Sequence, residues 1–313
     1  MQKKIIILEG GFNEEHEVSL NTSKKVKDSL KNLNYTFEIF SVSPSDFINQ
    51  IKNFDKNCIF FNALHGTYGE DGSIQKILEK NNFYYTHSDS KTSKIAFDKS
   101  LTKKNVKKID IPILESSFFS KNKITPEVLY ETYNKYGAFV MKPVSSGSSF
   151  GIKIFKSKQD VEDFKNNIEF EIKMYDNHNE IMLEKYIKGR ELTVGVWQNK
   201  NVSDSLAVTE IIYENDFYDY KAKYVKGLSR HILPAKIPKK IYDQCCYYAK
   251  IIHDHLGCKG ISRSDFIYDE NNIYFLEINS QPGLTMTSLL PEQLQFKSIH
   301  FDDLIENLIK ASL

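Results

Sequence analysis

The sequence predicts an α/β protein whose C-terminal two-thirds are α+β. Over the first ~90 residues strands and helices alternate, which is the order that builds a parallel, doubly wound sheet. Beyond them, two strands flank a glycine- and serine-rich loop, and a later pair of strands has the pattern of a hairpin. These observations predict three domains, covering residues 1–88, 89–187 and 188–313.

The N-terminal domain is predicted from short apolar runs that alternate with amphipathic helices. Residues 5–10 (IIILEG) are typical of a buried parallel strand that ends in a glycine turn. A helix follows over about 17–32, where Val26, Leu30 and Leu33 have i, i+4, i+7 spacing. Three more strands are predicted over 36–42, 58–64 and 83–87, with a helix in DGSIQKILEKNN between the last two.

The central domain is predicted to carry a flexible flap. A helix runs through Lys99, a second helix covers PEVLYETYNKYG, and the strand AFVMKP follows at 138–143. The loop VSSGSSFG (144–151) then leads to the strand IKIF, a helix in KQDVEDFKNNI and a closing strand, IMLEKYI. Two strands joined by such a loop are able to close over a ligand.

The C-terminal domain is predicted to combine antiparallel strands with two helices. ELTVGVW and SLAVTEIIY are typical of antiparallel strands, and the tyrosine-rich stretch after them is interpreted as a loop because it lacks apolar periodicity. A helix is predicted over about 240–256, with Gly257 as its stop. An amphipathic helix containing Leu304, Ile305 and Leu308 ends the chain.

Composition and charge narrow the classes of function. The chain has 313 residues, of which 41% are apolar and 27% charged, as in soluble globular proteins. Its 42 basic and 41 acidic side chains leave a net charge of +1, so we expect neither a nucleic-acid nor a membrane partner. The N-terminal apolar run is too short for a signal or membrane segment, and no two of the four cysteines have CxxC spacing. The expected location is the cytoplasm, with free thiols.

The stretch 263–288 predicts a metal site on a hairpin. Glu277 and Asn279 are two residues apart, so their side chains share one face of a strand. Asp265 lies on the other arm and joins them if the strand register allows, and Arg263 points the same way as Asp265. Three oxygen-bearing side chains on one sheet face suit Mg²⁺, which keeps positions open for water and phosphates. The alternative is a solvated acidic face; the Pro-Gly turn after the second strand favours the site.

Two glycine-rich stretches of the N-terminal domain are candidate ligand contacts. Gly10 and Gly11 precede a helix whose N-terminus could bind an anion, although Glu15 near its start could equally stabilise the helix dipole. HGTYGEDG (65–72) follows the third strand, where open α/β sheets contact their ligands, and His65 adds a polar group. The alternative for this stretch is a glycine-rich turn with Asp71 capping the next helix.

Phosphate contacts are expected in the central domain. VSSGSSFG offers backbone amides and hydroxyls, and Lys142 at the end of the preceding strand could reach the same phosphates. The stretch is not a Walker A motif, and a flexible hairpin loop is the alternative. A nucleotide bound in a cleft where the central and C-terminal domains join would need hydrogen-bond acceptors. Glu184 and Glu191 flank this join and are candidates, although on spacing alone they are surface charges. The tyrosine-rich loop, with Tyr224, is a substrate lid or a wet aromatic surface loop.

Together these stretches resemble the D-alanine–D-alanine ligases, members of the ATP-grasp superfamily. The resemblance covers the whole chain in order and rests on GG…EEHEVSL, HGTYGEDG, MKPVSSGSSFG, LEKYIKGRELTV, FYDYKAKY, GCKGISRSDF and LEINSQPGLT. It implies an ATP-grasp fold with ATP held between the central and C-terminal domains. It also implies two D-alanine substrates, two Mg²⁺ ions with Mn²⁺ able to substitute, a cytoplasmic homodimer and a role in peptidoglycan precursor synthesis.

The resemblance implies a two-step reaction: a D-alanine carboxylate attacks the γ-phosphate of ATP, and a second D-alanine amine displaces phosphate through a tetrahedral intermediate. Glu15 would hold the first ammonium beside His65, in a network with Ser148 and Tyr224. The resemblance implies that Arg263 and the amide of Gly283 stabilise the oxyanion of this intermediate. It also implies that Ser288 and Leu289 hold the carboxylate of the second D-alanine. The groups implied at ATP are Lys99, Lys142, Glu184, Lys185, Glu191 and Lys223, and the metal ligands are Asp265, Glu277 and Asn279.

Three positions depart from the commonest family pattern, and none of them is a proposed ligand. Ser264 stands where an apolar residue is usual, Phe275 replaces an aliphatic residue, and Lys76 occupies a position that is usually small. Alternative functions are a D-Ala–D-Ser or D-Ala–D-lactate ligase, or an ATP-binding scaffold without catalysis. Tyr224 favours D-alanine as second substrate, because the lactate-using members replace this tyrosine.

Overall fold

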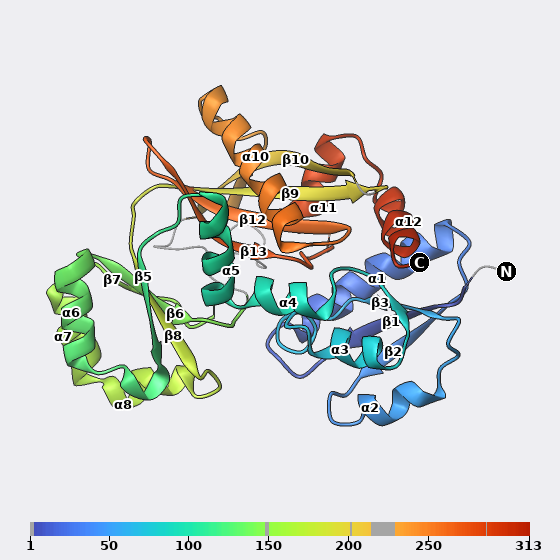
Figure 1. The fold of residues 1–313 in the computed structure, drawn as a ribbon, viewed down its shortest axis with the longest axis horizontal. Coiled ribbons are helices and arrows are strands. Elements are labelled where there is room, and N and C mark those ends of the chain that lie inside the picture. Colours follow the sequence, from blue (N-terminus) through green and yellow to red (C-terminus); the bar gives the residue numbers. More distant parts are fainter. Residues whose placement is uncertain (1–2, 148–149, 201, 214–228, 286) are drawn as a thin grey trace.

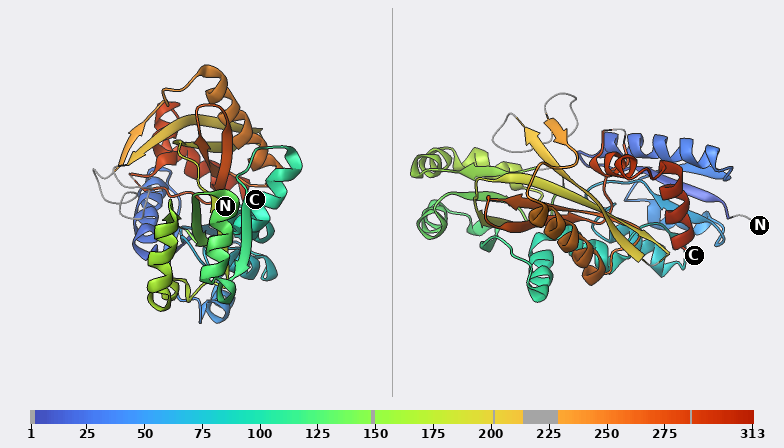
Figure 2. Two further views of the ribbon diagram at one scale, coloured as in Figure 1. Left: turned by 90° about the vertical axis from the view of Figure 1, so that its left-hand side faces the viewer. Right: turned by 90° about the horizontal axis from the view of Figure 1, so that it is seen from above.

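The computed structural model describes residues 3–147, 150–200, 202–213, 229–285 and 287–313, which form three sheets along one long axis (Figure 1). Figure 2 shows the five-stranded sheet in the middle, with the other two sheets at opposite ends. The predicted parallel sheet at the N-terminus and the antiparallel strands after it are confirmed. The exact domain boundaries stay a prediction.

The N-terminal sheet is parallel and has helices on both faces. Its order is β2-β1-β3-β4, from strands β1 (Ile5–Gly10), β2 (Phe37–Val42), β3 (Ile59–Asn62) and β4 (Tyr84–Tyr85), with helices α1 (His16–Asn32), α2 (Phe47–Gln50) and α3 (Ser73–Lys80). Successive side chains of β1 alternate between two cores: Ile5 and Ile7 pack with α1, whereas Ile6 and Leu8 pack with α2 and α3. The last helix, α12 (Phe301–Ala311), joins the first of these cores, which brings the two ends of the chain together (Figure 1).

The second sheet is antiparallel, in the order β5-β8-β6-β7. It comprises β5 (Ser116–Ser120), β6 (Phe139–Pro143), β7 (Lys153–Phe155) and β8 (Glu180–Lys185), with helices α6 (Pro126–Tyr136), α7 (Lys158–Asn166) and α8 (Ile168–Glu171). Local sequence explains where the longer helices begin. Thr125 caps α6 with Pro126 as its first residue, and Ser157 forms a capping box with Asp160 at α7.

The third sheet has the order β11-β10-β9-β12-β13. Its elements are β9 (Arg190–Asn199), β10 (Val202–Tyr213), β11 (Ser229–Ile232), β12 (Ile261–Tyr268) and β13 (Ile273–Asn279), with helices α10 (Lys239–Leu256) and α11 (Leu289–Phe296). Ala249 and Ile252 of α10 pack on Val194 and Phe266 of this sheet. The predicted hairpin is confirmed as β12 and β13. The tyrosine-rich stretch predicted as a loop lies outside the described residues.

The helix predicted to run through Lys99 is in fact two helices, α4 (Ser90–Phe97) and α5 (Lys99–Val106). Asp98 between them has an extended backbone, and its side chain accepts hydrogen bonds from the amides of Ser100 and Leu101. An aspartate that caps a new helix competes with continuation of the old one, which explains the break. Lys99 is thereby placed at the start of α5, with its backbone amide bonded to the carbonyl of Val144.

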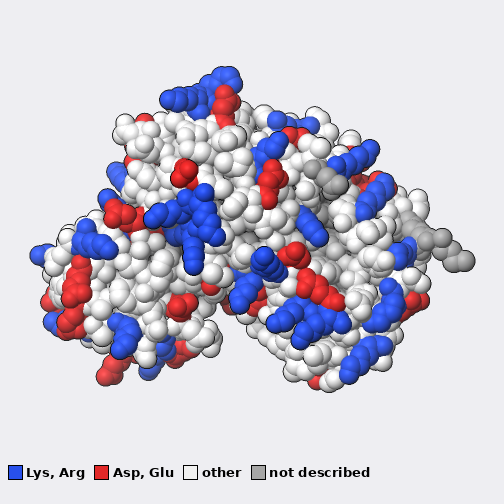
Figure 3. Space-filling model, viewed as in Figure 1, with Lys and Arg blue, Asp and Glu red and all other residues white. Residues whose placement is uncertain are grey.

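Four short 3₁₀ turns complete the described structure: Ile51–Asn53, Lys107–Ile109, Lys121–Lys123 and Ile172–Tyr175. Among the described residues, no helix is long and apolar enough to cross a membrane. The four cysteines all lie in the described part of the chain, and all are free thiols, as predicted. Figure 3 shows basic and acidic side chains interspersed on the visible face, as the near-zero net charge predicts.

Candidate active site

A cavity of about 720 Å³ lies between the second and third sheets, and it contains most of the side chains predicted to bind a nucleotide. Its lining includes Lys99, Lys142, Glu184, Lys185, Glu191, Asp265 and Glu277. These residues come from five strands and from the first residue of helix α5, so only the folded chain brings them together. The volume lies in the range of cavities that hold small molecules and cofactors.

The predicted metal ligands lie on the two strands of the hairpin, β12 and β13. Asp265 pairs with Glu277 across the two strands, and a bulge follows Asp265 before Phe266. The two carboxylates therefore share one face. Within the described ranges, no three His, Cys, Asp or Glu side chains form a group that could hold a metal ion, so the predicted site has two carboxylates and the amide of Asn279 as its protein donors. Two carboxylates and an amide oxygen are hard donors that fit Mg²⁺.

Asp265 is held from two sides. Arg263 donates from Nε and Nη2 to the two Asp265 carboxylate oxygens, at 3.0 and 2.9 Å. The hydroxyl of Thr193 on β9 donates to the same carboxylate. This fork of two parallel N–H···O bonds orients both the arginine and the aspartate. Arg263 also lines the smaller cavity that contains Glu15 and Gly283.

Glu184 on β8 is the centre of a buried ion network. Its side chain is 2% exposed, one carboxylate oxygen pairs with Lys103 of α5, and the other lies 2.9 Å from Nζ of Lys142 on β6. Burial works to raise the pKa of Glu184, but the two lysines outweigh it and hold the pKa below its ordinary value. The carboxylate predicted to contact the nucleotide therefore also holds Lys142 in the cavity.

Lys103 is a site residue that sequence reasoning missed. Burial lowers the pKa of Lys103 despite the nearby Glu184, whereas the pKa of Lys142 is raised: burial opposes this rise, but Glu184 and then Glu277 outweigh it. The only sequence signal is spacing, because Lys103 lies four residues after Lys99 on one helix and so shares its face. Its partner, on a distant strand, gives no local signal.

Lys99 links the glycine- and serine-rich loop to the β12–β13 hairpin. Its Nζ donates to the carbonyl of Ser146 at 2.9 Å and lies 3.3 Å from a carboxylate oxygen of Glu277. The neighbouring Asp98 forms a β-bridge with Ser145. The start of α5 therefore holds the near end of the glycine- and serine-rich loop against the third sheet.

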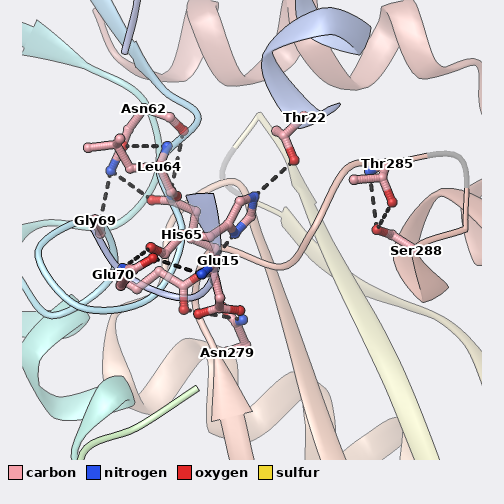
Figure 4. Close-up of polar contacts among 12 residues, drawn as sticks. Glu15, Thr22, Asn62, Leu64, His65, Gly69, Glu70, Asn279, Thr285 and Ser288 are labelled. Atoms are coloured by element: carbon pink, nitrogen blue, oxygen red, sulfur yellow. Dashed lines mark hydrogen bonds and ion pairs between the residues drawn. The ribbon is translucent and has the colours of Figure 1, made fainter. Parts of the chain in front are cut away.

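A second, smaller cavity of about 80 Å³ adjoins the first. Both are lined by Lys99, Ser146, Gly147 and Glu277, and the smaller one adds Glu15, His65, Glu70, Arg263, Asn279 and Gly283. Figure 4 shows the side chains of Glu15, Glu70 and Asn279 gathered near the ring of His65. A small charged molecule in this cavity would therefore lie directly beside whatever occupies the larger one.

His65 is fixed on both ring nitrogens. Its Nε2 lies 2.9 Å from the hydroxyl of Thr22 on α1, and its Nδ1 lies 2.9 Å from a carboxylate oxygen of Glu70 (Figure 4). The second Glu70 oxygen accepts a long hydrogen bond, 3.5 Å, from the amide of Asn279. In the sequence Glu70 is a polar residue of the loop 65–72 without a predicted role. In the fold it connects the N-terminal sheet to the β12–β13 hairpin.

Glu15 is buried at the start of α1, and two glycines make room for it. A Cβ on Gly66 would lie 2.5 Å from Oε2 of Glu15, and one on Gly147 would lie 2.7 Å from the same atom. Gly66 also has a φ of 69°, which other residues rarely adopt. These close approaches explain why both glycine-rich loops carry glycine at these positions.

The N-terminus of α11 lies next to Gly283, which lines the smaller cavity. Ser288 precedes this helix, and its hydroxyl accepts from the amide of Thr285 at 3.1 Å (Figure 4). A Cβ on Gly283 would lie 2.8 Å from the Ser288 hydroxyl, so the Pro-Gly turn and the helix start are in close contact. The amides at such a helix start, including that of Leu289, suit a carboxylate.

The remaining predicted residues are less constrained or not described. Lys185 lines the large cavity but is 42% exposed and pairs at 3.7 Å with Glu115. Glu191 lines the same cavity beside Tyr213, whose pKa is raised by burial and by this carboxylate. Ser148, Lys223 and Tyr224 lie outside the described residues, so their predicted contacts stay predictions.

Comparison with known proteins identifies the family. The model of the D-ala D-ala ligase C-terminus matches residues 75–310. A D-alanine–D-alanine ligase of Rhodospirillum rubrum is 36% identical over 314 residues, which cover 100% of this chain and 99% of the relative. Of the solved structures, the Bacillus anthracis D-alanine–D-alanine ligase complexed with ATP has a TM-score of 0.80 at 25% identity, covering 99% of this chain and 97% of its own.

The VanG D-Ala:D-Ser ligase of Enterococcus faecalis also has a TM-score of 0.80 at 25% identity, with 100% of both chains covered. Solved D-alanine–D-alanine ligases and this D-Ala:D-Ser ligase thus share the fold to a similar degree, and the family assignment rests on the full-length sequence match. With the ATP-grasp arrangement of sheets and the cavity between them, these matches show that the chain belongs to the D-alanine–D-alanine ligase family.

Proposed function

We propose that this protein joins two D-alanines into D-alanyl-D-alanine, using ATP and releasing ADP and phosphate. One observation carries the proposal: a nucleotide-sized cavity of about 720 Å³ shares four lining residues with a small, charged cavity of about 80 Å³. A γ-phosphate in the first can thus meet a small carboxylate in the second. The full-length match to a D-alanine–D-alanine ligase supports D-alanine as that carboxylate.

The lysines would receive the phosphates of ATP. Lys99 lies on the wall shared by the two cavities, and Lys142 lines the large cavity, where the buried contact with Glu184 holds it. Phosphoryl transfer requires mainly positioning and neutralisation of charge, which two fixed ammonium groups supply. Lys223 would add a third, while Glu184, Lys185 and Glu191 would bind the adenosine.

The first D-alanine would bind in the small cavity through its ammonium. Glu15 is a buried acid with two glycine backbones against it, and His65 is locked beside it by Thr22 and Glu70. With the ammonium held there, the carboxylate would point across the shared wall to the γ-phosphate. Attack by this carboxylate forms D-alanyl phosphate, and holding both reactants in place supplies much of the rate increase.

The second D-alanine would bind at α11, where Ser288 and the amide of Leu289 suit its carboxylate. Its amine attacks the acyl carbon of D-alanyl phosphate, giving a tetrahedral intermediate that then expels phosphate. Arg263 and the amide of Gly283 would donate to the oxyanion; both line the small cavity. A guanidinium has five N–H donors, so the fork to Asp265 does not prevent this. Ser148 and Tyr224 would close the network over Glu15.

Asp265, Glu277 and Asn279 would hold two Mg²⁺ ions, with Mn²⁺ able to substitute. Bound there, the ions would supply positive charge beside the β- and γ-phosphates. The donor set supports this, since it offers hard oxygens: Asp265 and Glu277 line the large cavity, and Asn279 lines the smaller one beside it. Equilibrium titration of Mg²⁺ into the protein with a non-hydrolysable ATP analogue tests the assignment: Asp265→Asn should weaken metal binding.

The activity is tested by mass spectrometry of products after incubation with ATP, Mg²⁺ and D-alanine, with D-serine and D-lactate in competition. D-Alanyl-D-alanine with matching ADP release is the expected result. A mixed dipeptide or depsipeptide would identify a D-Ala–D-Ser or D-Ala–D-lactate ligase and remove the specificity role given to Tyr224. ATP binding without product would identify a non-catalytic scaffold and refute the proposal.

We further propose that the enzyme is a cytoplasmic homodimer in peptidoglycan precursor synthesis. Family membership supports the pathway, because the dipeptide is a cell-wall precursor. Light scattering at several protein concentrations tests the dimer, for which a monomer mass at micromolar concentration would be the contrary result. Depletion of the protein in a growing cell should cause loss of shape and lysis that D-alanyl-D-alanine in the medium relieves.

A further inference from the structure

Two buried side-chain amides join the N-terminal sheet to the β12–β13 hairpin. Asn62 ends β3 and is 1% exposed, and Gln281 follows β13 and is 3% exposed, although 219 residues separate them in the chain. The Asn62 Nδ2 donates to the Gln281 Oε1 at 2.9 Å. In return, the Gln281 Nε2 donates to the backbone carbonyls of Leu64 at 2.6 Å and of Asn62 at 3.3 Å.

Every polar atom of this amide pair is used. The second Nδ2 hydrogen of Asn62 bonds the carbonyl of Gly69 at 2.9 Å, and its Oδ1 accepts from the amide of Leu64 at 3.1 Å (Figure 4). A buried amide that loses one hydrogen-bond partner still has the full free-energy cost of its desolvation. The two side chains therefore have one favourable arrangement, in which all of these hydrogen bonds form together. The pair therefore sets a distance and an orientation between two sheets, which an apolar contact would not do.

Both sides of the pair lead directly into the proposed site. On the N-terminal side, Leu64 precedes His65 and Gly69 precedes Glu70. On the other side, the backbone amide of Gln281 donates to the Oδ1 of Asn279 at 2.7 Å. Gln281 also stands two residues before Gly283, the proposed oxyanion donor.

We propose that Gln281 and Asn62 are positioning residues that hold the subsite of the first D-alanine in register with the metal and oxyanion groups. The inference rests on the proposed function for the identity of those groups. Neither residue touches a substrate in this arrangement; they act through His65, Glu70, Asn279 and Gly283. A shift of about 1 Å between the two halves of a site is enough to cost roughly 100-fold in rate.

The test replaces Gln281 by methionine, which keeps the length of the side chain and removes its three hydrogen bonds. The matched control is Gln293→Met. Gln293 is also buried and its side-chain amide also makes three hydrogen bonds, to Gly195, Thr193 and Thr209, but all of them stay within the third sheet and its helix. Both variants should lower the melting temperature, because each loses a satisfied buried amide.

The two variants should differ in kinetics. Gln281→Met should lower kcat/KM for the first D-alanine by about 10- to 100-fold while the Kd for ATP changes less than about twofold, since the large cavity keeps its lining. Gln293→Met should leave kcat/KM for the first D-alanine within about twofold of wild type. An unchanged kcat/KM in folded Gln281→Met, or an equal loss in both variants, overturns the positioning role.

A second measurement separates this inference from the proposed function. Hydrogen exchange of peptides covering 62–70 and 277–285 should rise together in Gln281→Met and stay at the wild-type level in Gln293→Met. If only one of these segments responds, the pair does not couple them and the inference is wrong. If wild type makes no dipeptide, the proposed function fails, and coupling of the two segments is judged on exchange alone.

Discussion

Glu184→Gln should destabilise the fold strongly, because it removes a carboxylate that contacts both Lys103 and Lys142. In the wild type two buried ammonium groups share one buried carboxylate. The substitution is nearly isosteric, so packing is kept while two positive charges lose their common partner. Breaking a buried ion pair by removing one partner costs about 3–5 kcal/mol. Because the neutral amide of glutamine can still accept a hydrogen bond, we expect a loss near the lower end of this range, about 3 kcal/mol.

Urea unfolding followed by circular dichroism measures the effect as a change in the transition midpoint at constant slope. The control is the double variant Lys103→Met with Glu184→Gln. It removes one of the two uncompensated charges, so it should be more stable than Glu184→Gln alone by roughly 1 kcal/mol or more. A loss below about 1 kcal/mol for Glu184→Gln, or a double variant less stable than the single one, would refute the view that the charges set the stability here.

The same network predicts the response to pH. The pKa of Glu184 lies below its ordinary value in the fold, so its ionised form contributes stability above the ordinary carboxyl pKa. This contribution is lost as the pH falls through the lowered pKa, that is, on the acid side of the ordinary value. Wild type and Glu184→Gln should therefore converge in stability in acid, and a constant difference between them down to low pH would contradict the charge argument.

Four further outcomes are expected. Arg263→Ala should lower kcat by about 100- to 1,000-fold in a turnover assay while ATP binding by calorimetry persists, because it removes a proposed oxyanion donor. Gly147→Ala should raise the KM for the first D-alanine by about tenfold or more, since its Cβ would approach Glu15 to 2.7 Å; an unchanged KM would exclude that clash. Asp265→Asn should raise the Mg²⁺ concentration needed for half-maximal turnover by about tenfold or more, and an unchanged requirement would remove Asp265 from the metal site. Burial lowers the pKa of His253 to about 4, so between about pH 6.5 and 4 the unfolded chain binds a proton that the folded chain does not. The free energy of unfolding should therefore fall over this range as the pH is lowered. His253→Gln should make this pH dependence weaker, as measured by urea unfolding at each pH.

Local patterns predicted a large part of the fold. Two apolar runs around the turn 269–272 predicted the hairpin, which the strand pairing confirms, and the period of two placed Glu277 and Asn279 on one face. The register, which the sequence left open, puts Asp265 opposite Glu277. Apolar runs and helical spacing predicted the parallel order of the first sheet. The break at Asp98 was missed because the apolar pattern continues across it, and the capping aspartate decided the local structure.

The sequence predicted which residues line the candidate site better than it predicted which of them contact one another. Lys99, Lys142, Glu184 and Glu277 do line one cavity, as the order of motifs implies. The partner of Glu184 on α5 was not foreseen, because a lysine on a helix usually faces water and nothing near Lys103 in the chain marks it as buried. Glu70 was similarly left without a role until the fold placed it between His65 and Asn279.

The sequence by itself determined the elements, the family and the types of group at the site, since these depend on spacing over a few residues. Only the tertiary structure decided which groups touch: the Lys103–Glu184–Lys142 network, the close approach of Gly66 and Gly147 to Glu15, and the pairing of Asn62 with Gln281 across 219 residues. The physical reason is that hydrogen bonds and ion pairs act over a few ångströms in space. Local sequence fixes turns and faces, whereas the packing of whole sheets brings distant side chains within that range.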